Sequence, residues 1–297
     1  MKLNLSKVEI NALKLLCSES FTASELAVRL GVKPAFVSRI IKSLNGLELI
    51  SVEKVGTKKK ISLSPGLHSF YFKKLYSSRE KTEIEEWLSG KTIELLVCLS
   101  SVDDGFTSMT LLKECSFSKA SFYKIIKKLG AIGIVVKIDN KYRIADGQAK
   151  SFALYYADTM QKIVLKKLGK WITSIRIGKH CVVRTLVNNA EQPFILSGEN
   201  ILRHEGLQVI PADYTDYYFT VDEKTRKIPL EEAFVHALLI ATETSVPNYS
   251  FFGVFLEKNK QKLDWIKLRE FAKKYLVSNE LQRLQDSLSL HDKMGDY

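Results

Sequence analysis

The sequence predicts an α+β fold in which a unit of three helices and a hairpin occurs twice and is followed by a mixed α/β domain. Three observations predict it: a 24-residue segment is repeated, helix and strand signals come in the same order around each copy, and strands alternate with helices after about residue 178. The 297 residues suffice for two or three domains, since a domain typically takes about 100 to 200 residues.

Positive charge is concentrated in the first part of the chain. Residues 1–180 carry 31 basic and 16 acidic side chains, whereas residues 181–297 carry 14 and 17, and the net charge of the whole chain is +12. An excess of positive charge says little about the fold, but it indicates what kind of partner a protein binds. Here it favours a polyanionic partner for residues 1–180.

Composition excludes several classes of protein. The hydrophobic content of 45% is too high for a disordered chain, and no apolar run approaches the roughly 18 residues that a membrane span needs. The first residues lack a signal-peptide cleavage region, so we expect a cytoplasmic protein with no membrane partner. The four cysteines are far apart and none has zinc-site spacing, so we expect no metal, no cofactor and four small core residues.

The repeat aligns residues 21–44 with residues 106–129 without a gap, at an offset of 85. Eight of the 24 positions are identical: Phe21/Phe106, Thr22/Thr107, Leu26/Leu111, Ala35/Ala120, Ile40/Ile125, Ile41/Ile126, Lys42/Lys127 and Leu44/Leu129. The same structural unit is therefore expected twice.

In the first copy, Ser6 predicts the start of one helix, and a capping box of Thr22 and Glu25 predicts the start of a second that ends at Gly31. A third helix starts at Pro34, whose missing N–H costs nothing in a first turn. Its apolar residues make one face and leave the other to Ala35, Ser38, Arg39 and Lys42. Residues 47–53 and 59–64 then predict a hairpin with a basic tip.

The second copy has the same order. A helix near residues 92–100 precedes a helix that begins at Thr107, and Ser118 caps a third helix. The outward side chains of this third helix are Ala120, Tyr123, Lys124 and Lys127. Asp139 and Asn140 tolerate positive φ and predict the two-residue turn of a short hairpin.

This order, with short turns at residues 30–35 and 115–120, resembles the winged helix-turn-helix of many bacterial and archaeal transcription regulators, over residues 5–76 and 90–146. The resemblance implies that each third helix enters the major groove of double-stranded DNA, while the hairpin, or wing, lies along the phosphate backbone or in the minor groove. The DNA-binding residues that it implies are Lys33, Ala35, Ser38, Arg39, Lys42, Ser43, Lys58, Lys59, Lys60, Lys119, Tyr123, Lys124, Lys127, Lys128, Lys141 and Arg143.

Arg39 suits a base contact because a guanidinium bonds bidentately to guanine, whereas lysines mainly contact phosphates without regard to sequence. The alternatives are that these residues form only the solvated faces of amphipathic helices, or that the modules bind proteins. We expect DNA binding more strongly from the first copy, which has the larger charge excess and the longer basic hairpin.

The predicted organisation has four parts. Residues 1–76 form the first module and end in a fourth helix, and residues 77–146 hold an acidic helical linker and the second module. Residues 147–178 are nearly free of helix breakers and predict one long connecting helix. This helix would either form a dimer interface or pack against the rest of its own chain. Residues 179–297 form the mixed α/β domain.

Within residues 179–297, strands are predicted at 180–187, 194–197, 215–221 and 250–258, with helices at 199–207, 230–242, 264–276 and 279–290. Residues 194–207, 228–239 and 263–288 resemble the C-terminal domain of AbiE-type antitoxin regulators, in which a winged helix also comes first. The sequence departs from that pattern at Glu205, which separates His204 from Gly206, and in having two modules. His204 and His236 are expected to be core histidines.

An enzymatic alternative rests on the same domain. Ser197 and Gly198 before a helix, with Asp213 and Asp216 near a strand, resemble the phosphate-binding turn and metal-binding carboxylates of nucleotidyltransferases. Two-metal chemistry needs carboxylates that converge on ions about 4 Å apart, and residues three apart on a regular strand point to opposite faces. A degenerate or never-catalytic domain is therefore preferred.

We accordingly expect a sequence-specific DNA-binding transcription regulator, not an enzyme, whose C-terminal domain forms a homodimer or binds a protein partner. The alternatives are a nucleotidyltransferase-like enzyme directed to nucleic acid by its basic half, and a protein-interaction scaffold.

Overall fold

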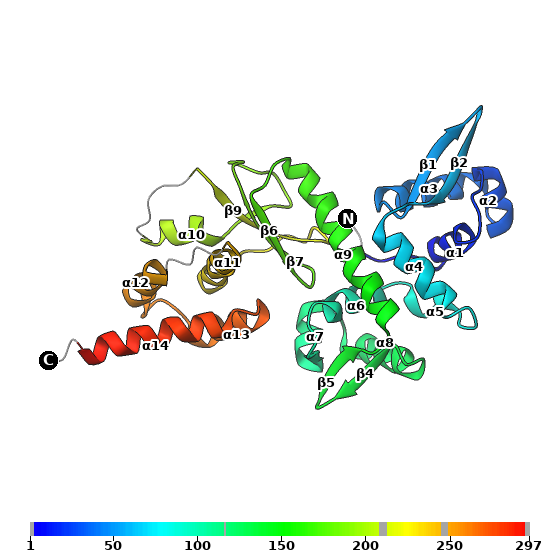
Figure 1. Ribbon diagram of the computed structural model, residues 1–297. Coiled ribbons are helices and arrows are strands. Elements are labelled where there is room, and N and C mark those ends of the chain that lie inside the picture. The colour runs from blue at the N-terminus through cyan, green and yellow to red at the C-terminus, as the bar shows by residue number, and fades with distance from the viewer. Residues whose placement is uncertain (1–2, 116, 208–212, 245–248, 295–297) are drawn as a thin grey trace. The chain divides into compact units, whose positions relative to one another are not determined.

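A computed structural model of the chain describes residues 3–115, 117–207, 213–244 and 249–294. It divides into two compact units, Met1–Ile163 and Val164–Tyr297 (Figure 1). Helices and small antiparallel sheets occur in both units, a mixed content that is compatible with the α+β class. No helix of the described ranges is both long enough and apolar enough to cross a membrane.

The first module opens the first unit. Its elements are α1 (Lys7–Leu16), α2 (Ala23–Leu30), α3 (Pro34–Gly46), β1 (Ile50–Val55) and β2 (Lys58–Leu63). Ser6 and Thr22 cap α1 and α2 as predicted, each in a complete capping box, and Gly31 ends α2 with a φ of 66°. Phe21 adds a bridge to Ile61 of β2, so a residue just before α2 joins the hairpin.

The core of the first module forms where the apolar faces of its three helices meet. The buried residues that build it are Ile10, Leu13, Leu26, Val37, Ile40, Leu44, Leu49 and Ile61. Burial of an aliphatic side chain contributes about 1.5 to 3 kcal/mol, so this core fixes α3 firmly on its inner side.

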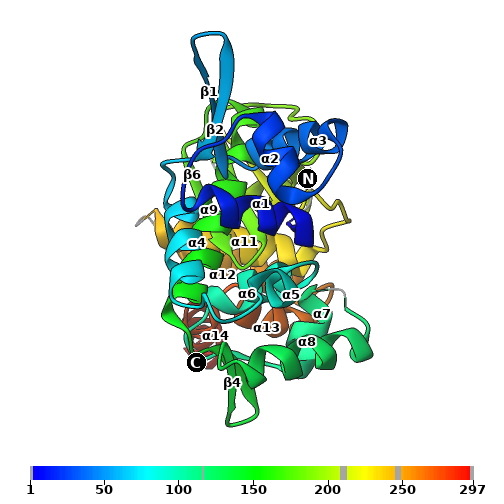
Figure 2. The same cartoon turned by 90° about the vertical axis from the view of Figure 1, so that its right-hand side faces the viewer.

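The second module repeats the arrangement. Its elements are α6 (Thr92–Ser100), β3 (Phe106–Thr107), α7 (Ser108–Cys115), α8 (Lys119–Ala131), β4 (Val135–Ile138) and β5 (Lys141–Ile144). Phe106 pairs with β5, as its repeat equivalent Phe21 pairs with β2. Ser118 caps α8, and Asp139 and Asn140 have the predicted positive φ, 48° and 61°. Figures 1 and 2 show the hairpins β1–β2 and β4–β5 at opposite ends of this unit.

The two modules are joined by three helices: α4 (Leu67–Ser77), α5 (Ile84–Leu88) and the first part of α9 (Gly147–Leu168). Acidic α5 contacts α1 through Glu86, whose carboxylate accepts hydrogen bonds of 2.5 and 2.7 Å from Lys7, and through Glu85, which pairs with Lys14 at 2.7 Å. The rings of Tyr71 on α4 and Tyr155 on α9 stack with centroids 4.9 Å apart.

The connecting helix is shorter than the sequence predicts. We expected one helix over residues 147–178, but α9 ends at Leu168 and is followed by Gly169, whose φ of 84° no helix accommodates. The residues that follow are rich in β-branched side chains and form β6 (Thr173–Ile177), which pairs with β7 (His180–Thr185). The expectation of a helix beyond Leu168 is therefore wrong.

The second unit is built on a four-stranded antiparallel sheet of order β6-β7-β9-β8, with β8 at Ile195–Leu196 and β9 at Thr215–Thr220. Strands β7 and β9 are buried throughout. The helices of this unit are the end of α9, then α10 (Gly198–His204), α11 (Leu230–Glu243), α12 (Tyr249–Asn259), α13 (Trp265–Lys274) and α14 (Ser278–Met294). Most of α11 is buried, so this helix is the centre of the core.

Residues 250–258 were expected to form a strand because they are rich in aromatic residues, and this expectation is wrong. They belong to α12. Phe252, Phe255 and Leu256 recur at helical spacing and are buried, and the rings of Phe252 and Phe255 lie 5.6 and 5.9 Å from that of Phe234 on α11. Packing against α11 thus overrides the local β propensity.

Candidate nucleic-acid interface

The outer face of α3 is polar and basic. Lys33, Ala35, Ser38, Arg39 and Lys42 are all exposed, as the sequence predicts, on the side of the helix opposite its buried apolar residues. Arg39 and Lys42 form no ion pair with any residue that the structure describes. Their charges are therefore available to an external anion.

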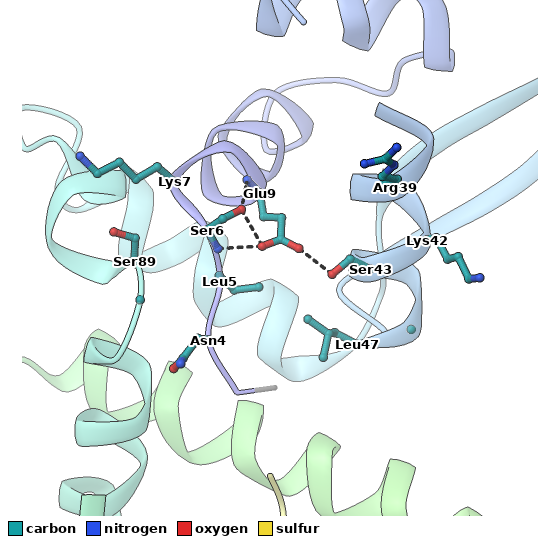
Figure 3. Close-up of a pocket in the computed structure, with 12 residues that line it drawn as sticks. Asn4, Leu5, Ser6, Lys7, Glu9, Arg39, Lys42, Ser43, Leu47 and Ser89 are labelled. Atoms are coloured by element: carbon teal, nitrogen blue, oxygen red, sulfur yellow. Dashed lines mark hydrogen bonds between the residues drawn. The ribbon is translucent and has the colours of Figure 1, made fainter. Parts of the chain in front are cut away.

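Ser43 is also exposed, but its hydroxyl donates a 2.5 Å hydrogen bond to Glu9 of α1. The other carboxylate oxygen of Glu9 accepts hydrogen bonds of 2.7 Å from the backbone N–H and the hydroxyl of Ser6 (Figure 3). Glu9 thus completes the cap of α1 and ties α1 to α3. We infer that Ser43 positions the third helix.

An open groove of about 1030 Å³ runs beside the C-terminal half of α3. Figure 3 shows Arg39 and Lys42 on its α3 side, with Lys7 and Ser89 on its far side. Lys7 pairs with Glu86, so Arg39 and Lys42 supply the unpaired positive charge of the groove. No sequence pattern indicates this groove, because residues 4–9, 39–47 and 89–90 meet only in the folded unit.

The first hairpin divides its lysines between two faces. Side chains alternate along a strand, so Lys58 and Lys60 lie on one face and Lys59 lies on the other. Lys59 is directly opposite Lys54 of β1, a residue that was absent from the predicted set. A two-residue turn at positions 56–57 sets this register, and a register argument from the sequence would have found Lys54.

The two faces differ in charge. Lys60 is opposite Glu53, and the pKa of Glu25 is held below its usual range, mainly by the backbone N–H of Thr22 and in part by Lys58 and Lys60. Lys54 and Lys59 are instead like charges in a directly opposed cross-strand pair, an arrangement that destabilises a sheet unless an anion lies close by. The Lys54 and Lys59 face is therefore the stronger candidate for phosphate contact.

The second module offers a smaller exposed set. Lys119, Tyr123, Lys124 and Lys127 lie on the outer side of α8. Lys128 is exposed but donates a hydrogen bond to the backbone carbonyl of Glu86, and Lys141 and Arg143 are half-buried. Of the seven predicted contacts, Lys128 is thus already hydrogen-bonded within the chain, and Lys141 and Arg143 are less exposed than the remaining four.

In the second unit, the carboxylates that suggested metal chemistry are not equivalent. Asp213 is exposed, whereas Asp216 is fully buried and accepts hydrogen bonds of 2.7 and 2.9 Å from the guanidinium of Arg184. Burial raises the pKa of Asp216, and Arg184 opposes this rise. A Cβ on Gly198 would lie 2.5 Å from a carboxylate oxygen of Asp216, so the turn at Gly198 is packed against the ion pair.

A second buried cluster surrounds His236. Its Nδ1 lies 2.7 Å from the hydroxyl of Ser197, and its Nε2 lies 3.9 Å from the carboxylate of Glu232. All three side chains are fully buried, so they are inaccessible to a substrate. The expectation of a core histidine is confirmed for His236 and is wrong for His204, which is exposed at the end of α10.

No family model matches this chain, and no curated protein resembles it significantly.

Proposed function

We propose that this protein is a sequence-specific, double-stranded-DNA-binding transcription regulator with two winged helix-turn-helix modules. The observation that carries the proposal is the outer face of α3, where Arg39 and Lys42 are exposed and make no ion pair within the described part of the chain. In this proposal α3 enters the major groove, and the wing β1–β2 contacts the backbone beside it.

The division of labour follows from side-chain chemistry. Arg39 presents a planar fork of donors that matches guanine O6 and N7, a pairing worth about 1 to 3 kcal/mol of discrimination against the wrong base. Lys42, Lys54 and Lys59 contact phosphates and supply affinity that does not depend on sequence. The buried inner face of α3 supports this role because it holds the helix rigidly.

The second module is a further DNA contact in this proposal, through Lys119, Tyr123, Lys124 and Lys127. Tyr123 is 44% exposed, and its ring packs edge-on against Phe122, with centroids 5.2 Å apart. An exposed aromatic residue beside lysines suits apolar contact with a thymine methyl group. The short wing contributes less than the first, since Lys141 and Arg143 are half-buried.

We further propose that the second unit is an association domain, like the C-terminal domain of AbiE-type antitoxin regulators, and that it pairs with a second copy of the chain. Support comes from three exposed apolar side chains, Trp171 and Ile172 just before the edge strand β6 and Leu186 just after β7. The backbone N–H of Ile172 donates to the carbonyl of Arg184 at 2.7 Å, so these residues gather at one end of the sheet. Exposed apolar groups on an edge favour association.

The proposal is tested by replacing Arg39 and Lys42 together with Ala. The probe is the duplex DNA that wild-type protein enriches from a random pool. We expect the double variant to lose retention on this DNA at moderate salt, while its circular dichroism and melting temperature stay unchanged. The matched control replaces Arg269 and Arg283, which are exposed in the second unit, and should bind as wild type does. Unaltered retention by the Arg39 and Lys42 variant would contradict the proposal.

A further inference from the structure

The sulfur atoms of Cys98 and Cys115 lie 3.3 Å apart in the core of the second module. Cys98 belongs to α6, every residue of which is buried, and Cys115 is the last residue of α7. Both are thiols in this structure, with exposures of 4% and 1%. Because the two cysteines are 17 residues apart, the sequence does not reveal that their sulfur atoms lie close together.

We propose that Cys98 and Cys115 form a redox modification site, which closes into an intramolecular disulfide on reaction with a small hydroperoxide. A disulfide bond is about 2.05 Å long, so the two sulfurs need to approach by roughly 1.2 Å. Cys115 is the last residue of α7, so the bond would form at the end of that helix. The bond would covalently tie α6 to the segment that leads into α8 at Lys119.

The chemistry balances in two steps. One thiolate attacks the peroxide, whose O–O bond breaks, and forms a sulfenic acid while the departing oxygen takes up a proton as water or an alcohol. The second sulfur then attacks the sulfenic sulfur, which forms the S–S bond and releases water. Two thiols are oxidised by two electrons, and one peroxide is reduced.

Burial defines the class of oxidant. Cys98 and Cys115 are buried, with 4% and 1% of each residue exposed, which excludes a bulky disulfide such as oxidised glutathione and limits the oxidant to a hydroperoxide of water-like size. The other two cysteines belong to other elements: Cys17 is the C-cap of α1, and Cys181 lies in β7 of the other unit. The short distance between two sulfurs is what distinguishes Cys98 and Cys115.

The test exposes the reduced full-length protein to hydrogen peroxide or to oxidised glutathione, quenches the reaction, unfolds the protein and alkylates it. Mass spectrometry then counts alkylated thiols and identifies cross-linked peptides. We expect the count to fall from four to two with peroxide, with a single linked peptide pair containing Cys98 and Cys115, and to remain four over the same time with oxidised glutathione.

Variants separate this pair from general oxidation. Cys98→Ala and Cys115→Ala should each abolish the linked peptide, whereas Cys17→Ala should keep it and show a count that falls from three to one. Four alkylated thiols after peroxide in the wild type, or a link through Cys17 or Cys181, would overturn the proposal. Equal oxidation by glutathione disulfide would overturn the oxidant class. None of these readouts requires DNA.

Discussion

At the scale of single residues, His236 is the clearest case of burial controlling chemistry. The pKa of His236 is lowered to about 3, mainly by burial; Glu232 opposes this lowering, and Lys274 and Arg226 add to it. Its ring stacks on Tyr218 and meets the edge of Tyr275, so the second-unit core holds a neutral imidazole. Because an unfolded histidine titrates near pH 6.5, the unfolded chain binds more protons between about pH 6.5 and 3.

The stability of the second unit should therefore fall as pH drops below about 6.5, with His236 contributing a slope that approaches 1.4 kcal/mol per pH unit. Urea unfolding between about pH 7.5 and 4.5 measures this slope. His236→Asn should lower the free energy of unfolding at neutral pH and reduce its slope against pH by nearly 1.4 kcal/mol per pH unit, the effect of one proton. His204→Asn, at an exposed site, should leave the slope unchanged. An equal slope in the wild type and His236→Asn would refute the assignment.

Local residue roles were the most predictable from sequence, and long-range pairs the least. Ser6, Thr22 and Glu25 act within one helical turn, and their capping roles depend only on spacing. The bidentate pair of Arg184 and Asp216 joins residues 32 apart on adjacent strands, so it depends on strand order and register, which the sequence alone does not supply. Their pairing leaves Asp216 without the free oxygens that the metal-binding alternative requires.

At the scale of elements, the hairpin β1–β2 carries different charges on its two faces, and mutations can test each face separately. Lys54→Gln with Lys59→Gln should reduce the slope of log affinity against log salt by about 1.8, since each lost phosphate contact is worth about 0.9. The charge-matched pair Lys58→Gln with Lys60→Gln should reduce it less, because Glu53 and Glu25 already lie near those lysines. Affinities on one duplex at several salt concentrations measure both. A larger effect from Lys58 and Lys60 would contradict this assignment of faces.

The elements that the sequence predicted correctly have strong local signals, and the two errors arise where tertiary contacts decide. Pro34, Gly31 and the Asp139 and Asn140 turn each fix a boundary through their own backbone preferences. The apolar run at residues 250–258 fits a strand or a helix equally well, and only its packing on α11 selects a helix. The end of α9 likewise depends on the pairing of β6 with β7.

At the scale of the whole molecule, the proposed pairing of second units gives a measurable mass. Sedimentation equilibrium should yield about twice the chain mass of 33.8 kDa. Ile172→Lys with Leu186→Lys should shift the protein to the monomer, because charges on an apolar interface are costly to bury. Val254→Lys with Ile266→Lys, at comparably exposed apolar sites, should leave the dimer intact. A wild-type monomer at micromolar concentration would contradict the pairing.

The two modules belong to one compact unit, and the contacts of α5 and α9 fix them to each other. The sequence predicted both modules from the repeat, but it did not reveal this connection, because the ion pairs of Lys7 and Lys14 with α5 span more than 70 residues. Arg79, which follows α4, strengthens the connection between the modules because it donates hydrogen bonds to the carboxylate of Asp146 and to the carbonyl of Ile132. A rigid pair of modules is expected to read two DNA elements at a fixed spacing.

DNA recognition through α3 is tested by selecting bound duplexes from a random pool with the wild type and two variants in parallel. We expect the wild type to enrich two elements at constant spacing, Arg39→Ala with Lys42→Ala to lose one element, and Lys124→Ala with Lys127→Ala to weaken the other. Absence of enrichment by the wild type, or the same two elements from the Arg39 and Lys42 variant, would contradict DNA recognition through α3.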